Sequence, residues 1–411
     1  MKHVTTHTLL AGAIAVALGT VLAGSVQAAG FSDDATAKLE LRNFYFNRDF
    51  RDPGAQSKAE EWAQGFIFKA ESGFTEGFIG FGLDVYAGLG VKLDSADERA
   101  GTGLLPNSYG NEGPGSYSEA TAAAKVRLSR SVLKVGGLMP KLPIASSGDL
   151  RLLPQEFTGA SVAMNEIDNL DVQGGQLREV NYRNSTNSED IRATLGGSSD
   201  RFNYLGGDYS FNDKRTKVGL WGAELTDVYE QTLLNLVHSQ PIGDWTLGAN
   251  LAYFDTGDSG NQALDIDHQM KSLLLSAATG AHTLRLGYQH SDGDTAFPYL
   301  AETDPYIANY VQILDFTRAD EKSWQARYDI NFASLGVPGL SAFTRYVSGD
   351  NFSVGATEGK EWERDIDVSY TLQSGPLKNL ALRWRNATVR SNATRDIDEN
   401  RLIMSYSFAL K

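Results

Sequence analysis

The chain ends in Arg401-Leu-Ile-Met-Ser-Tyr-Ser-Phe-Ala-Leu-Lys411, a stretch in which two kinds of side chain alternate. Successive residues of a β-strand point to opposite faces. One face would therefore carry only large, mainly apolar side chains, at positions 402, 404, 406, 408 and 410. The other face is mostly small or polar. Such a strand suits a barrel wall that separates lipid from an aqueous lumen.

The N-terminus has the organisation of a secretory signal peptide. Lys2 supplies a positive charge, residues 9–24 form a run of apolar and small residues, and Val-Gln-Ala at 26–28 fits an A-x-A-like cleavage site. The alternative, a membrane anchor, calls for a longer apolar run. We therefore expect a signal peptide at 1–28 and one mature domain at 29–411.

Composition narrows the functional classes. The absence of cysteine excludes thiol catalysis and cysteine-ligated metals, and a formal net charge of −14 argues against a nucleic-acid partner. The mean hydropathy of -0.30 does not fit a helical membrane protein. It is compatible with a β-barrel, because only alternate residues of a barrel strand face lipid. We expect no cofactor.

A repeated unit runs from Lys38 to the C-terminus: an alternating strand of roughly ten residues, then turn residues, then another strand. Short connections alternate with long ones, as expected for turns at one rim of an outer-membrane barrel and loops at the other. The short connections fall at 129–131, 212–214, 243–244, 280–282 and 374–379, and the long ones at 94–117, 140–158, 184–200, 255–267, 291–317, 349–360 and 392–398.

This pattern predicts an all-β fold, a transmembrane antiparallel β-barrel of about 18 strands with loops that fold inward and narrow the pore. A 16-stranded barrel is an alternative, because some central segments alternate poorly. A soluble β-sandwich would show the same alternation. The signal peptide, the tryptophans at strand ends and the terminal strand favour the barrel.

Arginine identifies the lumenal face, because an arginine that faces lipid at mid-bilayer costs about 2–4 kcal/mol. Leu382 and Trp384 mark the lipid face of their strand, so Arg383 and Arg385 should point inward. Arg183, Arg285 and Arg327 also lie on polar faces of their strands. Arg42 and Arg48 share one face of the first strand, although Phe44 and Phe46 lie on that same face.

Inward arginines at different heights would form a ladder for anions, because each guanidinium can hold a carboxylate in two parallel hydrogen bonds. One charge pair at ~4 Å is worth about 1 kcal/mol in water and about 4 kcal/mol at an effective dielectric near 20. Steps of this size attract a solute and still release it. The alternative is that these arginines pair with carboxylates and only fill space.

Two of the long connections are rich in proline and apolar residues, which suits folding into a lumen. One of them, at 140–158, contains Pro-Lys-Leu-Pro and Arg-Leu-Leu-Pro-Gln and would place Lys141 or Arg151 near a constriction. The other, at 291–317, carries Asp292, Asp294 and Asp304, which would either oppose the basic wall or remain solvated.

Enzyme-like patterns are weak. Gly-Asp-Ser-Gly at 257–260 lies in an expected surface loop, and four residues match by chance too easily to indicate a protease. The histidines lack metal-site spacing, and the aspartates at 255–267 do not match a calcium-binding EF-hand loop. We expect no catalytic residues and no metal.

A series of motifs follows in order along the chain: Leu-Arg-Asn-Phe-Tyr-Phe-Asn-Arg-Asp-Phe at 41–50, Pro-Lys-Leu-Pro at 140–143, Arg-Leu-Leu-Pro-Gln at 151–155, Phe-Pro-Tyr at 297–299, Asp-Pro-Tyr at 304–306, Asp-Glu-Lys-Ser-Trp-Gln-Ala-Arg-Tyr-Asp at 320–329, Thr-Arg-Tyr at 344–346, Gly-Asp-Asn at 349–351 and Leu-Arg-Trp-Arg at 382–385. Taken together, these motifs resemble the OprD (Occ) family of outer-membrane carboxylate channels of pseudomonads.

The resemblance implies an 18-stranded barrel, narrowed by its third and seventh loops, with a basic ladder for carboxylate-bearing solutes. The ladder positions it implies are Arg42, Arg48, Arg151, Arg183, Arg285, Arg327, Arg383 and Arg385. The alternation along its strand does not decide whether Arg345 faces the lumen. It excludes Arg364 from the ladder, because Arg364 shares the face of Ile366, Val368 and Tyr370. Phe408 is followed by Ala-Leu-Lys, a departure from the usual aromatic end.

The expected function is passive, substrate-selective uptake of small carboxylates across the bacterial outer membrane, with cyclic or aromatic carboxylates favoured. A channel for basic amino acids is the alternative within the family, and an outer-membrane barrel enzyme is the alternative outside it. The expected surroundings are outer-membrane lipid and lipopolysaccharide, and the barrel would be a monomer or a weak trimer.

Overall fold

A computed structural model of the protein describes residues 29–54, 56–260 and 264–411. The predicted signal peptide lies outside these residues. Within these described ranges, eighteen long antiparallel strands form the wall. They are β1 (Thr36–Phe50), β2 (Lys58–Glu71), β3 (Ile79–Asp94), β4 (Ser116–Leu128), β5 (Ser131–Leu138), β8 (Glu156–Met164), β9 (Leu170–Asn181), β13 (Phe202–Phe211), β14 (Thr216–Leu225), β15 (Tyr229–Ile242), β16 (Trp245–Asp258), β17 (Asp267–Thr279), β18 (His282–Gly293), β19 (Lys322–Asn331), β20 (Leu340–Val354), β21 (Thr357–Thr371), β22 (Ala381–Ser391) and β23 (Ile397–Ala409).

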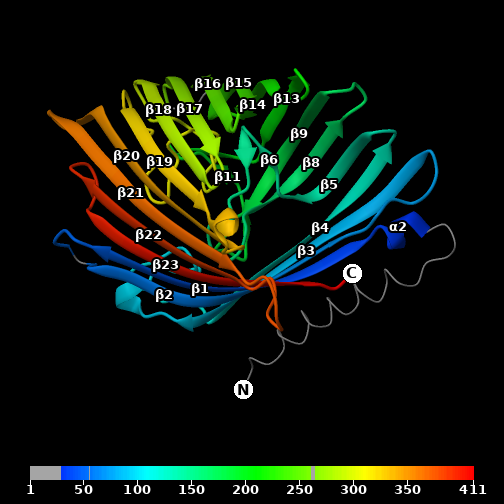
Figure 1. The fold of residues 1–411 in the computed structure, drawn as a ribbon, viewed down its shortest axis with the longest axis horizontal. Helices are drawn as coiled ribbons and strands as arrows, with labels where there is room; N and C mark the ends of the chain where they lie inside the picture. Colours follow the sequence, from blue (N-terminus) through cyan, green and yellow to red (C-terminus); the bar gives the residue numbers. More distant parts are fainter. Residues whose placement is uncertain (1–28, 55, 261–263) are drawn as a thin grey trace.

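The first and last strands close the barrel by pairing along nearly their whole length, from Lys38 opposite Ala409 to Phe50 opposite Ile397. The strands surround the interior in Figure 1. The prediction of about 18 strands in a closed antiparallel barrel is confirmed.

Smaller elements decorate this wall. They are α2 (Ala29–Asp33), the 3-10 turns η2 (Asp97–Arg99) and η3 (Phe332–Leu335), and the short strands β6 (Lys141–Leu142), β7 (Ala145–Ser146), β10 (Ser188–Glu189), β11 (Ile191–Arg192) and β12 (Ser198–Ser199). Among the residues described, none of the helices has the length and apolarity to cross a bilayer.

The terminal strand has the two faces that its alternation predicts. Leu402, Met404 and Phe408 are exposed on the outside of the barrel, whereas Arg401 and Glu399 are completely buried inside it. The same alternation holds on β18, where the apolar Leu284 and Leu286 point outward. The outer face is therefore the apolar one.

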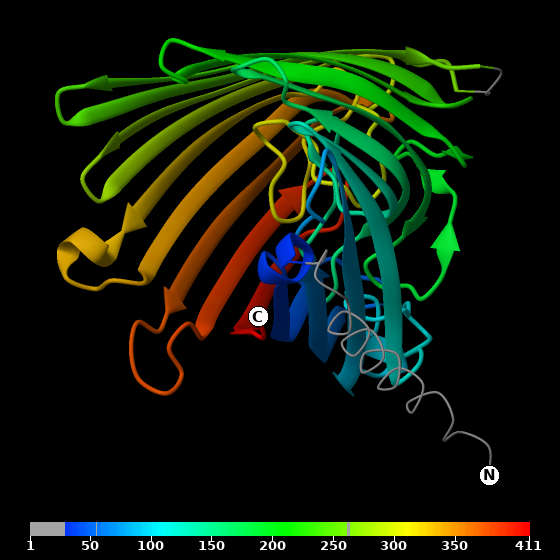
Figure 2. The ribbon, with the colours of Figure 1, turned by 90° about the vertical axis from the view of Figure 1, so that its right-hand side faces the viewer.

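Connections differ at the two rims, and Figure 2 shows several tight hairpins on one side of the barrel. One expected loop is wrong: residues 349–360 are mostly strand, since β20 runs to Val354 and β21 starts at Thr357. Only a two-residue turn remains at the tip, with Gly355 at a φ of 60° that favours glycine. Each of the two strands has 15 residues, so the strands continue through the segment that we expected to be a loop.

Two long connections fold into the barrel, where they lie among the strands in Figure 1. We call residues 139–155 the first inward loop and residues 294–321 the second inward loop. Leu152 and Leu153 of the first are fully buried against Phe44 and Phe46 of β1. This contact explains why aromatic residues share the inward parity of the β1 arginines: the loop shields them from water.

The second inward loop packs in the same way. Phe297 and Leu300 join a large buried cluster with β9 and β13 to β17, and Phe316 joins another with Val347 and Val389. A third segment, residues 95–115, also contributes buried side chains, Leu104 and Leu105, which the sequence did not lead us to expect. Within the described residues, at least three segments therefore pack buried side chains against the lumenal face of the wall.

Candidate functional site

Arginines gather on the lumenal side of β18 to β20. In the strand register, Arg285 is opposite Arg327, which is opposite Arg345. Asp329 pairs with the first two: its Oδ2 lies 3.1 Å from Arg285 Nε and its Oδ1 lies 2.6 Å from Arg327 Nη2. Arg345 forms an ion pair with the buried Asp365. The orientation of Arg345, which parity left open, is therefore inward.

The next strand, β21, turns a row of carboxylates toward the lumen. Glu361, Glu363, Asp365 and Asp367 alternate with outward residues and are all buried. Sequence reasoning missed this row. The alternation Glu-Trp-Glu-Arg-Asp-Ile-Asp at 361–367 is visible in the sequence and could have identified it.

Asp367 forms ion pairs with two arginines of β22. Its Oδ2 lies 2.7 Å from Arg383 Nη2 and 3.2 Å from Arg385 Nε. The Arg385 side chain is 9% exposed, whereas that of Arg383 is 42% exposed. Both point into the lumen as their parity predicts, but only Arg383 offers much of its guanidinium to a solute.

A second basic cluster lies at the seam between β23 and β1. Arg48 Nη2 is 2.7 Å from Glu399 Oε2, and Arg401 Nε is 2.6 Å from Glu399 Oε1. The guanidinium carbons of Arg48, Arg151 and Arg401 lie 5.4, 5.3 and 4.8 Å from the centre of the Phe46 ring. Cations over an aromatic face are attracted to it. Sequence reasoning missed Arg401, although it has the inward parity of the terminal strand.

The first inward loop meets the wall at Arg42. Arg42 Nη1 lies 2.6 Å from Asp149 Oδ1 and Nη2 lies 2.9 Å from Glu40 Oε1. Arg151, on the same loop, donates to the backbone carbonyls of Thr102 and Leu150 at 3.2 and 3.0 Å. Arg151 is thereby held in place by neutral partners.

The two remaining predicted positions lie apart from these clusters. Arg183, in the connection that follows β9, approaches Glu302 of the second inward loop, with 3.4 Å between Nε and Oε2. Asp294 is exposed at the start of that loop. The neighbouring Asp292 pairs with Lys271 at 2.6 Å on the outer face. Arg364 points outward, as its parity indicates, and is described further below.

Carboxylates of the wall hold the second inward loop in place. Glu363 accepts hydrogen bonds from the backbone N–H groups of Gln312, Ile313 and Leu314 at 3.1, 3.0 and 2.7 Å. The Gln312 amide also donates to Glu399 at 2.9 Å. Charge-assisted hydrogen bonds to backbone N–H groups are strong, so this loop is fixed to the wall.

The two inward loops are also joined to each other. Asp304 donates its backbone N–H to the Ser146 carbonyl at 2.9 Å, and the Gln155 amide donates to the Ala301 carbonyl at 2.8 Å. The loops therefore form a single plug that is anchored to the barrel.

Tyr299 and Asp315 connect two parts of the second inward loop, where the Tyr299 hydroxyl donates to the Asp315 carboxylate. Burial raises the pKa of Asp315 to about 6, although the hydrogen bond from Tyr299 acts in the opposite direction. This loop therefore carries a carboxyl group that titrates close to neutral pH.

Among the described residues, at least three spaces remain in the lumen. Arg42, Arg383 and Arg385 line one of about 340 Å³, together with Phe44 and Asp149. A second, of about 390 Å³, shares Arg383 and is lined also by Arg327, Asp329 and Phe343. Arg383 thus stands between two compartments.

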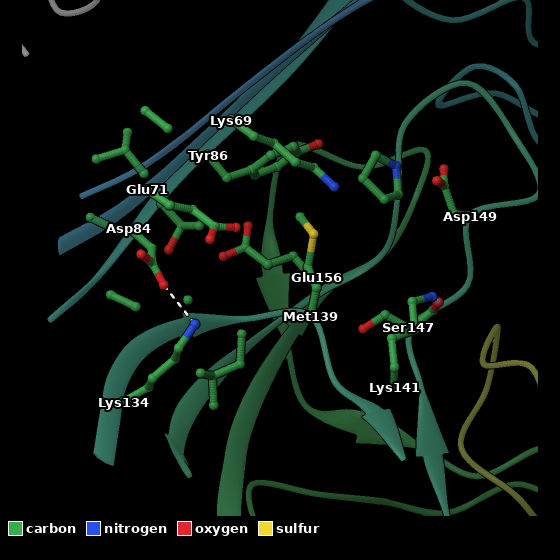
Figure 3. A pocket seen from close by; sticks show the side chains of 18 residues that line it. Lys69, Glu71, Asp84, Tyr86, Lys134, Met139, Lys141, Ser147, Asp149 and Glu156 are labelled. Carbon is green, nitrogen blue, oxygen red and sulfur yellow. Dashed lines mark hydrogen bonds and ion pairs between the residues drawn. The ribbon is translucent and has the colours of Figure 1, made fainter. Parts of the chain in front are cut away.

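The third space, of about 350 Å³, shares Asp149 with the first and lies mainly against β2 to β5. Figure 3 shows that residues of both signs of charge line it, the lysines being Lys69, Lys134 and Lys141 and the carboxylates Glu71, Asp84, Asp149 and Glu156. In the same view, the Lys134 ammonium is bound to the Asp84 carboxylate, at a distance of 2.6 Å. This wall is therefore not simply acidic.

Comparisons with known proteins agree with this architecture. A family model described as outer membrane porin, OprD family, matches residues 29–410. The chain is 42% identical over 400 residues to the porin-like protein GalP of Pseudomonas putida, covering 96% of this chain and 97% of that protein.

Solved structures are equally similar. OccK9 (OpdG) of Pseudomonas aeruginosa superposes with a TM-score of 0.91 at 49% identity, over 93% of this chain and 100% of that one. OpdK of the same organism, solved with vanillate, superposes with a TM-score of 0.88 at 43% identity, over 92% of this chain and 100% of that one.

Proposed function

Because this chain belongs to the OprD family of outer-membrane porins, we propose that it admits small carboxylate-bearing solutes by passive diffusion along its lumenal arginines. Proteins of this family are channels of the outer membrane, not enzymes. The selectivity for carboxylates and the ladder are our proposal. We include in the ladder Arg42, Arg48, Arg151, Arg183, Arg285, Arg327, Arg383 and Arg385, and we add Arg345 and Arg401.

The position of Arg383 is the observation that carries this proposal. It lines two adjoining lumenal spaces, and its side chain is 42% exposed although it is paired with Asp367. A solute carboxylate that reaches Arg383 can take up the guanidinium donors that Asp367 leaves free. A contact of about 1–4 kcal/mol, depending on the local dielectric, is strong enough to attract and weak enough to release.

Cyclic or aromatic carboxylates suit the space around Arg383 better than purely polar ones. Leu150, Ala381 and Ile403 add apolar surface next to Arg42, Arg383 and Arg385. A ring could lie on that surface while its carboxylate meets the arginines. OpdK, which is similar over nearly the whole chain, was solved with vanillate, an aromatic carboxylate.

A channel for basic amino acids would need a strongly acidic surface near the ladder. The carboxylates of β21 do not offer such a surface, because they are buried and already bound by arginines or by backbone N–H groups. The third lumenal space places three lysines beside its four carboxylates, which lowers its affinity for cations. We therefore favour carboxylates alone. We retain the proposals of a signal peptide at 1–28, a mature barrel at 29–411, a role for Asp294 in opposing the basic wall, and a monomer or weak trimer.

Single-channel recording with added benzoate tests the proposal. We expect the wild-type current to be blocked by benzoate, and the double substitution Arg383→Ala with Arg385→Ala to weaken the block at least tenfold, equivalent to about 1.4 kcal/mol. Arg364→Ala, which alters an outward arginine, is the matched control. Equal block in the double variant would refute the ladder.

Liposome uptake identifies the solute class. Proteoliposomes would be supplied in parallel with benzoate, a dicarboxylate and arginine. We expect benzoate to enter fastest. Preferential entry of arginine would instead support the alternative within the family.

A further inference from the structure

Arg364 is an arginine on the outer face of the barrel. It belongs to β21, where it points away from the buried row of carboxylates, and it is exposed. Its Nη2 donates to Asn386 Oδ1 at 2.9 Å and to Thr388 Oγ1 at 3.0 Å. Both partners are neutral. Within the part of the chain that the structure describes, Arg364 forms no ion pair with a carboxylate.

Three other cations on the outer face, in contrast, are paired with carboxylates. Lys271 lies 2.6 Å from Asp292, and Arg390 Nη1 lies 3.0 Å from Asp398. Arg51 Nε is 2.7 Å from the same Asp398. Arg364 differs because its positive charge and several of its five N–H donors are left available to something outside the chain.

The depth of Arg364 indicates what surrounds it. It follows Trp362 by two residues on the same outward face, and β21 begins at the rim that carries the extended β20–β21 turn. Aromatic residues mark the interface between hydrocarbon and head groups. Arg364 is therefore at the level where a guanidinium can meet lipid phosphates.

Hydrogen bonds connect Arg364 with a groove further along the wall. Asn386, its partner, donates to Asn400 Oδ1 at 3.2 Å, and Trp384 Nε1 donates to the same oxygen at 3.2 Å. Trp384 in turn lines an outward-facing groove of about 750 Å³. The polar group and the groove are thus parts of one continuous surface.

The groove is almost entirely apolar. Val368 and Tyr370 continue the outward face of Arg364 along β21, and Leu382, Leu402 and Trp62 line the groove with them. The surface therefore has a cationic end at Arg364 and an apolar end that runs toward the opposite rim. That combination matches an amphiphile with an anionic head and a hydrocarbon tail.

We propose that this surface binds one phosphorylated lipid of the outer leaflet, with a phosphate on Arg364 and an acyl chain in the groove. The planar guanidinium suits a phosphate, which it can engage through two parallel hydrogen bonds. The anionic glycolipid of the outer leaflet, lipid A, carries both phosphate and acyl chains. It is the occupant to which we commit.

Native mass spectrometry of the purified full-length barrel tests this site. The probes are diphosphorylated lipid A and the same lipid after removal of its phosphates. The variants are Arg364→Gln, which removes the charge, and Arg364→Lys, which keeps it. Lys271→Gln is the matched control, because Lys271 is another outward cation near an apolar groove and is already paired with Asp292.

We expect the wild type to retain one diphosphorylated lipid and Arg364→Gln to bind it about fivefold more weakly, the equivalent of ~1 kcal/mol for one cation at a phosphate surface. Arg364→Lys and Lys271→Gln should stay within about twofold of the wild type. The dephosphorylated lipid should not distinguish wild type from Arg364→Gln.

Two outcomes would overturn the proposal. Equal affinity of the wild type and Arg364→Gln for the diphosphorylated lipid would show that Arg364 does not contact the phosphate. Loss of dimers or trimers in Arg364→Gln, without loss of lipid, would assign the surface to a second copy of the chain. Far-ultraviolet circular dichroism of each variant would confirm that the barrel is folded.

Discussion

Arg383 and Asp367 form an ion pair across neighbouring strands, with 2.7 Å between Nη2 and Oδ2, although nearly half of the arginine side chain remains exposed. The Arg383 guanidinium therefore contacts both the buried Asp367 carboxylate and the solvent in the lumen. The carboxylate therefore sets how strongly Arg383 can attract a passing anion.

Asp367→Asn should make the channel more selective for anions. The substitution removes one negative charge from the lumen but keeps a hydrogen-bond acceptor near Arg383 and Arg385. A charge at ~4 Å contributes at least about 1 kcal/mol, so benzoate should block the current at least about fivefold more strongly. The reversal potential in a salt gradient should shift in the direction of greater anion permeability.

Asp292→Asn is the control for this experiment. Asp292 pairs with Lys271 on the outer face, so its loss should leave the reversal potential unchanged. An unchanged potential in Asp367→Asn as well would mean that this carboxylate does not influence permeating ions.

Glu363→Gln should loosen the second inward loop. Both Glu363 oxygens accept backbone N–H groups of that loop, and a glutamine replaces one of these oxygens with a donor. Each hydrogen bond to a charged group is worth about 1.5–3 kcal/mol. We expect noisier single-channel currents and faster proteolytic cleavage within residues 294–321. Glu358→Gln, an exposed position of the same strand, should behave like the wild type.

Phe46→Leu should destabilise the barrel more than Phe44→Leu. Both rings are buried on the same face of β1 and stack on each other. Three guanidinium groups surround Phe46, and within the described residues none is found over the Phe44 ring. Each cation–π contact contributes roughly 0.5–1 kcal/mol. Urea unfolding should show an extra loss of about 1.5–3 kcal/mol for Phe46→Leu, and equal losses would rule out this stabilisation.

Attachment of the second inward loop should weaken as pH rises through about 6, the pKa to which burial raises Asp315. Because this value lies above the usual aspartate pKa near 3.9, the folded state favours the protonated form. The resulting stabilisation is complete below about pH 4 and is lost through about pH 6. Hydrogen exchange of residues 294–321 should therefore accelerate between about pH 4 and pH 6, the interval between the two pKa values.

Asp315→Asn supplies the comparison, because asparagine cannot ionise but can still accept the hydrogen bond from Tyr299. Exchange in this variant, corrected for the intrinsic effect of pH on amide exchange, should show no step near pH 6. A step that persists in Asp315→Asn would assign the titration to another group of the loop.

Alternation along single strands was sufficient to predict the barrel and the direction of several side chains. Leu382 and Trp384 placed Arg383 and Arg385 in the lumen, and the terminal strand has the two faces that its sequence indicates. These predictions succeed because side chains alternate between lipid and lumen along a strand, and this alternation can be recognised from neighbouring residues alone.

Pairing between strands and loops was beyond such reasoning. Asp367 meets Arg383 only because β21 and β22 have a particular register, and Glu363 meets residues 312–314 only because a distant loop folds inward. Neither relationship produces a periodic pattern in the sequence. Phe44 and Phe46 were ambiguous for the same reason, since the loop that covers them lies about a hundred residues away.

The junction of β1 and β23 has a consequence for the order of folding. Arg48 and Glu399 are separated by 351 positions, and the Arg401 guanidinium lies over the ring of Phe46. Contacts between residues so far apart in the chain form late, because the whole intervening segment must first be ordered. The basic cluster at this seam can thus exist only after the final strand has docked, and a barrel that lacks that strand would lack half of the cluster.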